Sequence, residues 1–443
     1  MTAMVSRRRK VSSKRRQPLI RINVDFQKFT LDNGLTVILR QDKRVPVVAV
    51  NVGYHVGSKN ESPGKTGFAH LFEHLMFEGS KNVKKGEFDK FISLAGGYNN
   101  AFTTEDVTNY YEVVPSNQLE LALWLESDRM LQFSITEEAL KTQREVVKEE
   151  KRWRIDNRPY GDAPMRIQEL LFPTGQYHWP VIGSMEDIDS ASMEDVKEFY
   201  EKYYRPDNAV LVISGDISYS KGKEAVEKYF SEIPRGGTEL PALNFVDVPL
   251  NGEAVQEVRS SVPSPALFVA YKIPQEGTED YYAMNQVSKI LSDGDSSRLY
   301  KRLVYETQAA SDFDVSTEGL EKSGVFAISA FATPGHTAEE LLELIDDEIK
   351  KMKETLVTNY EFEKAQNSSV TSYVGRLSTN SGVAELLAHY EMIFQSPDLI
   401  NSEVDRELSV SRQSIRDATQ RLLNENRVVL FYKPLDMQEY KNA

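Results

Sequence analysis

The feature that most constrains this chain is the segment Thr66–Gly79, which holds two histidines and a glutamate at His70, Glu73 and His74. The segment has no proline and few β-branched residues, and Gly79 stands where a helix C-cap is expected, so we predict a helix. At 3.6 residues per turn, the two histidines lie one turn apart on one face, with the glutamate beside them. Two such imidazoles can share a metal ion, and a free carboxylate there can take a proton from water. The alternative is a chance match on an amphipathic helix, which is rare in a chain of 443 residues with six histidines.

A third metal ligand is then needed, because catalytic zinc usually has three protein ligands and one open position. The stretch 136–150 predicts a long helix, with Thr136 as its N-cap and an acidic first turn. Gln143 and Glu150 lie seven residues apart and therefore share a face of this helix. A carboxylate on that face can reach the metal.

The two segments together resemble the pitrilysin-type inverzincins, the superfamily of mitochondrial processing peptidase and insulin-degrading enzyme. That family has H-x-x-E-H followed, further along the chain, by an E-R-x-V-x-x-x-E run, which here spans residues 143–150. The resemblance covers most of the chain from about residue 24. It implies a zinc-dependent metalloendopeptidase that cleaves extended or unfolded peptides, with Glu73 as the general base. The implied Zn²⁺ ligands are His70, His74 and Glu150, with Glu149 as the alternative to Glu150.

The resemblance also implies a substrate site. Gly96-Gly97 and the residues after it resemble the family's edge strand beside the zinc, which holds the peptide by β-augmentation; a plain hairpin with a glycine turn is the alternative. The implied substrate-binding residues are Asn100, Ala101, Phe102, Thr103 and Phe77. Phe77 is expected to floor the pocket for the residue after the cut, or else to be an ordinary core residue. Gln143 stands where the family has a glutamate supporting the ligands, and an amide can still orient one.

Two family features are missing. Active members carry an arginine and a tyrosine in the C-terminal half that grip the substrate, and these positions hold Tyr305 and either Ser311 or Ala310. Some family members divide the zinc site and this pair between two chains, so we expect a zinc-less homologous partner in a heterodimer, with a homodimer as the alternative. The acidic residues that read substrate arginine in processing peptidase are replaced by Tyr160 and Pro164, so specificity for presequences is not expected.

The composition argues against several kinds of site and binding partner. The chain has no cysteine, which rules out disulfides and thiolate metal sites, and no apolar stretch approaches the length of a membrane span. The net charge is −14, yet residues 1–17 carry seven basic residues and no acidic one. The remaining 46 basic and 67 acidic residues leave a charge of −21, which disfavours nucleic acid and favours cationic peptides, unless it is only a well-solvated surface.

The order of predicted elements indicates an α+β fold with two homologous α/β halves, each a mainly antiparallel sheet packed with helices. The family resemblance implies that this chain forms one half of a clam-shaped dimer. We expect a basic disordered arm over residues 1–20, a zinc-bearing domain over 21–233, a linker over 234–250 and a metal-free domain over 251–443. We call 21–233 the first half and 251–443 the second half. The location is expected to be cytoplasmic, or periplasmic or organellar if the N-terminus is processed. The rival function is a non-catalytic subunit that serves assembly or peptide binding.

Overall fold

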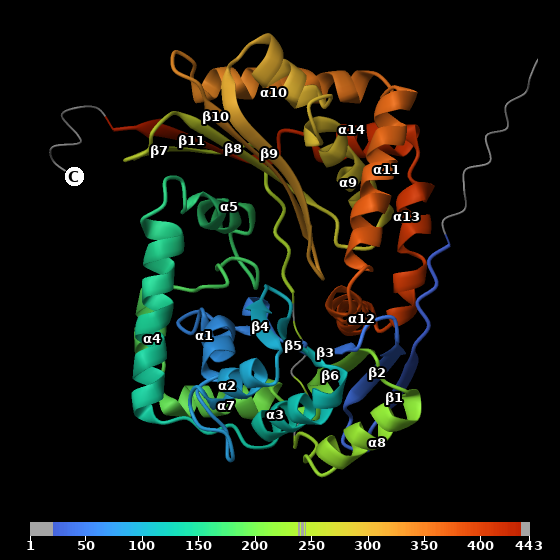
Figure 1. Ribbon diagram of the computed structural model, residues 1–443. Helices are drawn as coiled ribbons and strands as arrows, with labels where there is room; N and C mark the ends of the chain where they lie inside the picture. The colour runs from blue at the N-terminus through green and yellow to red at the C-terminus, as the bar shows by residue number, and fades with distance from the viewer. Residues whose placement is uncertain (1–20, 238–239, 241–242, 244, 436–443) are drawn as a thin grey trace, which may run out of the picture.

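The computed structural model describes residues 21–237, 240, 243 and 245–435. The predicted basic arm over residues 1–20 lies outside them. The described chain forms two β-sheets with helices, an α+β arrangement in which the sheets lie at opposite ends of the molecule (Figure 1). The α+β fold predicted from the sequence, with a helix-packed sheet in each half, is thus confirmed. Within the described ranges, no helix combines the length and the apolar character needed to cross a membrane.

The first sheet has six strands in the order β1-β2-β6-β3-β5-β4. Its strands are β1 (Gln27–Thr30), β2 (Thr36–Gln41), β3 (Val47–Tyr54), β4 (Tyr98–Thr103), β5 (Thr108–Pro115) and β6 (Ala209–Gly215). The helices of this part are α1 (Phe68–Leu75), α2 (Glu87–Leu94), α3 (Leu119–Leu131), α4 (Glu137–Lys151), α5 (Ala163–Leu171), α6 (Met185–Ser190), α7 (Met193–Tyr203) and α8 (Tyr219–Phe230). The turn Asp32-Asn33-Gly34 has the Asn-Gly pair that is typical of a β-hairpin, and β1 and β2 pair antiparallel on either side of it.

The second sheet has five strands in the order β7-β11-β8-β10-β9. Its strands are β7 (Ala254–Ser260), β8 (Ala266–Ile273), β9 (Ala310–Gly319), β10 (Gly324–Ala332) and β11 (Arg427–Pro434). The helices of this part are α9 (Glu279–Ser292), α10 (Ala338–Glu354), α11 (Asn359–Arg376), α12 (Asn380–Phe394), α13 (Glu403–Ser409) and α14 (Arg412–Leu422). From β7 onward, this sheet repeats the order and directions of β2-β6-β3-β5-β4, including one parallel pair at the start.

The segment from Val262 to Ile273 has the pattern of a strand throughout, but only its part from Ala266 onward forms one. Pro263 and Pro265 cannot donate to a sheet ladder, and β8 begins only at Ala266. The edge strand β7, which precedes the prolines, was not predicted; it carries the polar residues Gln256, Glu257 and Arg259, and its Val255 is half-exposed.

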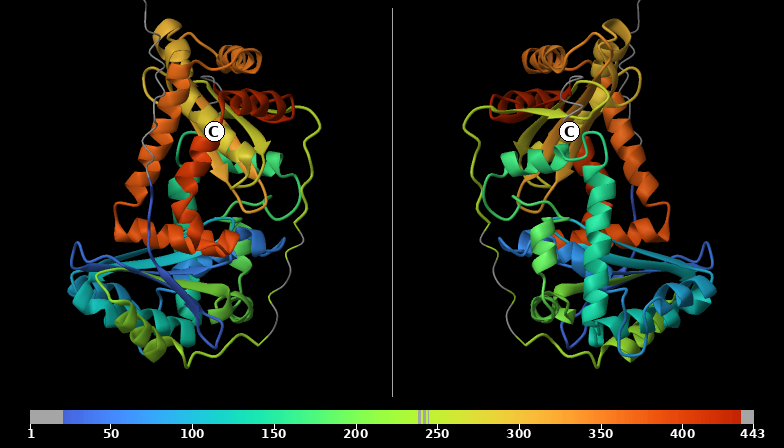
Figure 2. Two further views of the ribbon diagram at one scale, coloured as in Figure 1. Left: turned by 90° about the vertical axis from the view of Figure 1, so that its right-hand side faces the viewer. Right: turned by 90° about the vertical axis from the view of Figure 1, so that its left-hand side faces the viewer.

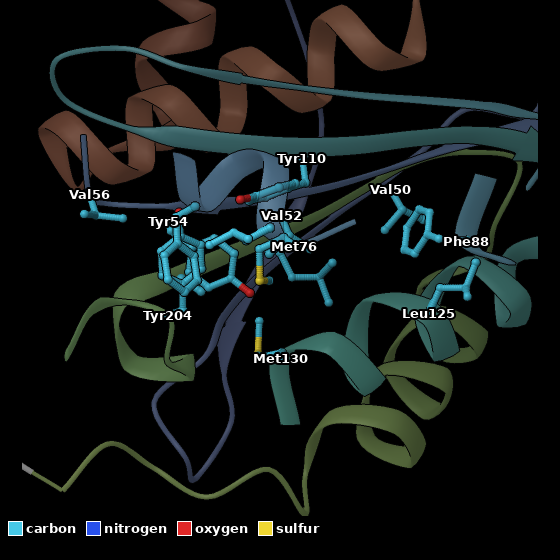
Figure 3. Packing of buried hydrophobic residues seen from close by; sticks show 14 of the residues in the cluster. Val50, Val52, Tyr54, Val56, Met76, Phe88, Tyr110, Leu125, Met130 and Tyr204 are labelled. Carbon is cyan, nitrogen blue, oxygen red and sulfur yellow. The ribbon is translucent and has the colours of Figure 1, made fainter. Parts of the chain in front are cut away.

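The main core of the first half lies between the first sheet and helices that include α1, α3 and α7. Tyr54 of β3 and Tyr110 of β5 meet Tyr204 there, beside Met76 at the end of α1 and Met130 of α3 (Figure 3). This packing fixes α1 against the first sheet.

Each half also covers a sheet of the other half. Helix α12 of the second half packs along β3 and β6 on the opposite face of the first sheet (Figure 2), where Val383 and Leu387 meet Val212. Helix α5 of the first half packs on the second sheet, where Ile167 and Leu171 belong to one apolar cluster with strand residues. The two sheets are therefore held in one compact body.

Candidate active site

Helix α1 carries His70, Glu73 and His74, and its N-terminus is buried and fixed by a carboxylate. Glu61 accepts hydrogen bonds from the backbone N–H groups of Gly67 and Ala69, both at 2.8 Å. Gly67 has φ +82°, and a Cβ there would lie 2.6 Å from the carbonyl oxygen of Ile182, so only glycine fits this turn. The helix ends at Leu75 rather than at the predicted glycine cap, Gly79.

The structure brings His70, His74 and Glu150 together. One ligand atom from each of the three lies within 4.8 Å of the other two. Glu150 Oε2 is 3.2 Å from His74 Nε2 and 3.7 Å from His70 Nε2. Glu150 comes from α4, whose predicted N-cap is confirmed, because Thr136 accepts a hydrogen bond from the Ala139 N–H. Two imidazole nitrogens and one carboxylate form the donor set of a catalytic zinc site.

The charge states of these groups suit a cation. Burial and the neighbouring His74 lower the pKa of His70 to about 4, so its ring is neutral at pH 7 and a nitrogen lone pair is free to bind a metal. The hydrogen bond with His74 lowers the pKa of Glu150 and keeps its carboxyl group ionised. Glu149, the alternative ligand, is mostly exposed and forms an ion pair with Arg152.

The carboxylate of Glu73 lies beside this cluster and is held from one side. Thr103 Oγ1 donates a 2.6 Å hydrogen bond to Glu73 Oε2, which links α1 to β4. Burial raises the pKa of Glu73 above its usual value, and the hydrogen bond from Thr103 opposes that rise. A half-buried carboxylate with a raised pKa beside a metal-ligand cluster is a strong candidate for a general base.

Strand β4 forms the wall beside the cluster. It is the last strand of the first sheet, paired with β5 alone among the described strands. A cavity of about 1000 Å³ joins this strand to the cluster. The predicted substrate-binding residues that line the cavity are Asn100, Ala101, Phe102 and Thr103. An extended peptide can add to this free edge through main-chain hydrogen bonds.

Two other predicted site residues, Phe77 and Gln143, do not line the cavity. Phe77 packs edge-on against Phe88 and under the guanidinium of Arg129, and it is not among the residues that line the cavity. Gln143 Nε2 donates a 2.6 Å hydrogen bond to Glu78 Oε1, which ties α4 to the end of α1. The position of Gln143 therefore supports the packing of the two helices that carry the ligands.

The sequence analysis missed Arg154, which also lines the cavity. Its Nη1 lies 2.7 Å from Glu150 Oε1, the oxygen that faces away from the histidines. It sits in a π-helical turn over Arg152–Asp156 that continues α4. The i,i+4 spacing from Glu150 to an arginine was the available signal. Arg154 orients Glu150 so that Oε2 faces the two imidazoles.

The fold and the cluster define a class of two-sheet proteins with an inverted zinc-peptidase motif. A sequence model described as "Insulinase (Peptidase family M16)" matches residues 36–166, and one described as "Peptidase M16 inactive domain" matches residues 190–369. The chain is 33% identical to "Zinc protease PqqE" of Helicobacter pylori over 82% of each chain. The chain belongs to the M16 peptidase family.

Another relative and two solved structures are also similar to this chain. The chain is 25% identical to "Probable mitochondrial-processing peptidase subunit beta" of Schizosaccharomyces pombe, covering 80% of this chain and 79% of that one. A crystal structure of a protease from Helicobacter pylori matches with a TM-score of 0.89 and 31% identity, over 93% of this chain and all of the other. The M16 inactive domain from Pseudomonas fluorescens has the same fold, with a TM-score of 0.84 at 17% identity, over 93% of this chain and 98% of that chain.

Proposed function

We propose that this chain is a zinc metalloendopeptidase that cleaves extended or unfolded peptides. The observation that carries the proposal is the convergence of His70, His74 and Glu150 within 4.8 Å, beside Glu73 and a free sheet edge. The donor set fits zinc, and the two histidines and Glu150 are the residues that would hold it. A zinc ion there supplies a Lewis acid that polarises the scissile carbonyl.

The chain's own residues would carry the other steps. The substrate backbone pairs with the free edge of β4, which places one peptide bond beside α1. Glu73 takes a proton from the attacking water and then delivers it to the leaving amine. Thr103 holds Glu73 Oε2, so that Oε1 is left for the water. Because main-chain pairing requires an extended strand, folded proteins are excluded as substrates.

We propose further that a partner chain completes the site. In the second half, Arg298 forms a bidentate pair with Glu361, and Arg302 lies near Glu306 and Asp347. Tyr305 has no guanidinium to offer and is 77% exposed. The second half therefore has no arginine where the family's pair is expected, which supports a zinc-less homologous partner.

The test is cleavage of a mixed pool of unfolded peptides by the zinc-loaded chain, alone and over a range of protein concentrations. Glu73→Gln keeps the size of the side chain but removes the base, so we expect the rate to fall by roughly 10²–10⁴-fold with zinc content unchanged. Zinc binding without cleavage until a homologous chain is added supports the partner. Equal cleavage by the wild type and Glu73→Gln would refute the peptidase and favour the non-catalytic subunit.

A further inference from the structure

A second cavity, of about 320 Å³, adjoins the one at the metal-ligand cluster. The residues that line both cavities are Glu105, Pro164 and Gln168. Gln168 stands between them, with its Nε2 3.4 Å from Glu105 Oε1 and 3.0 Å from the carbonyl oxygen of Trp179. Glu105 follows β4 by two residues, so a peptide lying along β4 reaches the mouth of the second cavity.

The walls of this second cavity are largely apolar. They come from α5 of the first half and from the face of the second sheet that α5 covers (Figure 1). Ile167, Leu171 and Phe172 lie on one side, and Phe268 and Val325 on the other. A hydrocarbon chain entering from the active-site cavity would lose its contact with water there.

The polar groups of the second cavity are unbalanced in charge. Glu105, Asp314 and Glu318 line it, while no lysine, arginine or histidine in the described part of the chain does. Asp314 and Glu318 alternate with core residues along β9, so both point to the same face of the sheet. Burial, and then the charge of Glu318, raise the pKa of Glu105 to about 7. Partial removal from water, and then the charge of Asp106, raise the pKa of Glu318.

Two lysines close to residues of the second cavity are engaged elsewhere. Lys272 reaches the outer side of the Phe172 ring, and its Nζ forms an ion pair with Asp247. Lys59 Nζ lies 2.8 Å from Asp106 and also contacts Glu321. Among the described residues, no lysine, arginine or histidine forms an ion pair with Glu105, Asp314 or Glu318.

We infer that the second cavity binds a lysine or arginine side chain of the peptide held on β4. Its apolar walls fit the aliphatic stem, and Glu105, Asp314 and Glu318 receive the cationic end. This inference rests on the proposed function, whose peptide it locates, and it makes the chain selective for basic residues at one substrate position.

The experiment measures binding rather than cleavage. Fluorescent peptides carry lysine, norleucine or glutamate at one position at a time, and their binding to the zinc-loaded Glu73→Gln chain is followed by anisotropy. We expect lysine to bind about tenfold more tightly than norleucine at one position, the size expected for a charge-assisted hydrogen bond. The double variant Asp314→Asn/Glu318→Gln should remove most of that preference.

Asp312→Asn is the matched control, because Asp312 lies on the same strand and the same face but outside the second cavity. It should leave the preference unchanged. A preference that survives in the double variant, or that favours norleucine or glutamate, overturns the inference.

Chemical labelling locates the side chain independently. The chain has no cysteine, so Ser316→Cys places a single thiol on the wall of the second cavity, and Asp312→Cys places one outside it. A peptide whose selected residue is a cysteine in mixed disulfide with cysteamine keeps an ammonium group at the end of that side chain, and the variant's thiol displaces cysteamine to form a protein–peptide disulfide. The first variant should react faster, and equal rates would contradict the inference. If the selectivity holds while the zinc-loaded wild type cleaves no peptide either alone or with a homologous chain added, the peptidase proposal fails and the basic site stands.

Discussion

Two helix pairs occupy corresponding places in the two halves and differ in what they hold. Helix α1 follows β3 and packs against α4, and helix α9 follows β8 and packs against α11. The first pair meets through His70, His74 and Glu150. The second pair meets through Gln286, whose Nε2 donates to Ser369 at 2.9 Å and to Glu407 of α13 at 2.7 Å.

The difference lies in what the side chains of each cluster bind. Gln286 is fully buried, and its Nε2 donates to neighbours within the second half, while its Oε1 has no hydrogen-bond partner among the described residues. The first cluster instead faces a cavity of about 1000 Å³, with two imidazoles and a carboxylate turned toward one point. The same frame thus holds a donor–acceptor network in one half, whose Ser369 and Glu407 line a smaller cavity of about 390 Å³, and a set of three metal-ligand groups in the other, so the site and not the fold decides the chemistry.

The largest expected effect comes from replacing the carboxylate between α1 and α4 by a neutral amide, the group that lies between α9 and α11. Glu150→Gln removes the only carboxylate of the ligand set, and an amide is a poor zinc ligand. Zinc affinity should fall by more than the roughly 10–100-fold that loss of an outer-shell partner costs, and peptide cleavage should fall with it. A competition assay with a coloured chelator measures the affinity.

Glu149→Gln is the control for this variant, because Glu149 is the neighbouring glutamate and its side chain is turned toward Arg152. It should leave zinc affinity unchanged. A loss of zinc in Glu149→Gln with zinc retained in Glu150→Gln would reverse the assignment of the third ligand.

The second pair should respond in stability and not in metal binding. Gln286→Ala removes two hydrogen bonds and leaves the buried Glu407 with fewer donors. The free energy of unfolding should fall by about 1–3 kcal/mol, measured by urea denaturation, with zinc affinity unaltered. Gln413→Ala, on the exposed face of α14, should change neither. Reduced zinc binding in Gln286→Ala would show that the two clusters are coupled.

A smaller effect is expected at β4 and β9, the strands that occupy the same edge position in the two sheets. Thr103 of β4 donates to Glu73 of α1 at 2.6 Å, and Thr317 of β9 donates to the carbonyl oxygen of Met284 of α9 at 3.4 Å. Thr103→Val should lower kcat by about tenfold, the cost of one hydrogen bond to a charged group, with zinc affinity retained. Thr103→Ser should restore the rate, and Thr317→Val should not alter it. Equal rates in Thr103→Val and the wild type would remove Thr103 from the site.

The sequence predicted most of what depends on local pattern. The spacing of His70 and His74 placed both rings on one face of α1, and the structure has their centroids 4.9 Å apart. The N-cap at Thr136 fixed the start of α4 and with it the face that carries Glu150. Both follow from helix periodicity and capping, which act over a few residues.

What the sequence did not predict depends on contacts between distant segments. Helix α5 covers the second sheet, and Tyr160 just before it donates a 2.7 Å hydrogen bond to the carbonyl oxygen of Ser264. No local pattern specifies that a helix of one half packs on the sheet of the other. The second cavity arises from this packing, so Asp314 and Glu318 could not be connected to Glu105 from their positions in the chain.

The smallest expected effect concerns the N-termini of α4 and α11, which begin in similar ways. Thr136 and Thr358 both cap their helices, but the third residue is Ala139 in α4 and Glu361 in α11, where it completes a capping box. Burial alone would raise the pKa of Glu361, but hydrogen bonds from Arg298 and Thr358 outweigh it and lower that pKa to about 2. A carboxyl group whose pKa is lowered by folding stabilises the protein above its unfolded pKa, and this contribution is lost as the pH falls from about 4.5 toward 2.

Because Glu361 is partly exposed, this contribution should be only about 1 kcal/mol. Glu361→Gln should therefore be less stable than the wild type at pH 7, and the difference should shrink as the pH is lowered below about 4.5. Urea denaturation at several pH values from 7 to 3 measures this, and a constant difference across the range would contradict it. Because the helix start at Ala139 has no carboxylate at the third position, Ala139→Glu in α4 should create a weaker pH dependence of the same sign in the first half, since Thr136 can cap the new carboxylate but Glu137 and Glu138, rather than an arginine, lie in the same turn. The binding of zinc at the other end of that helix should be unaffected.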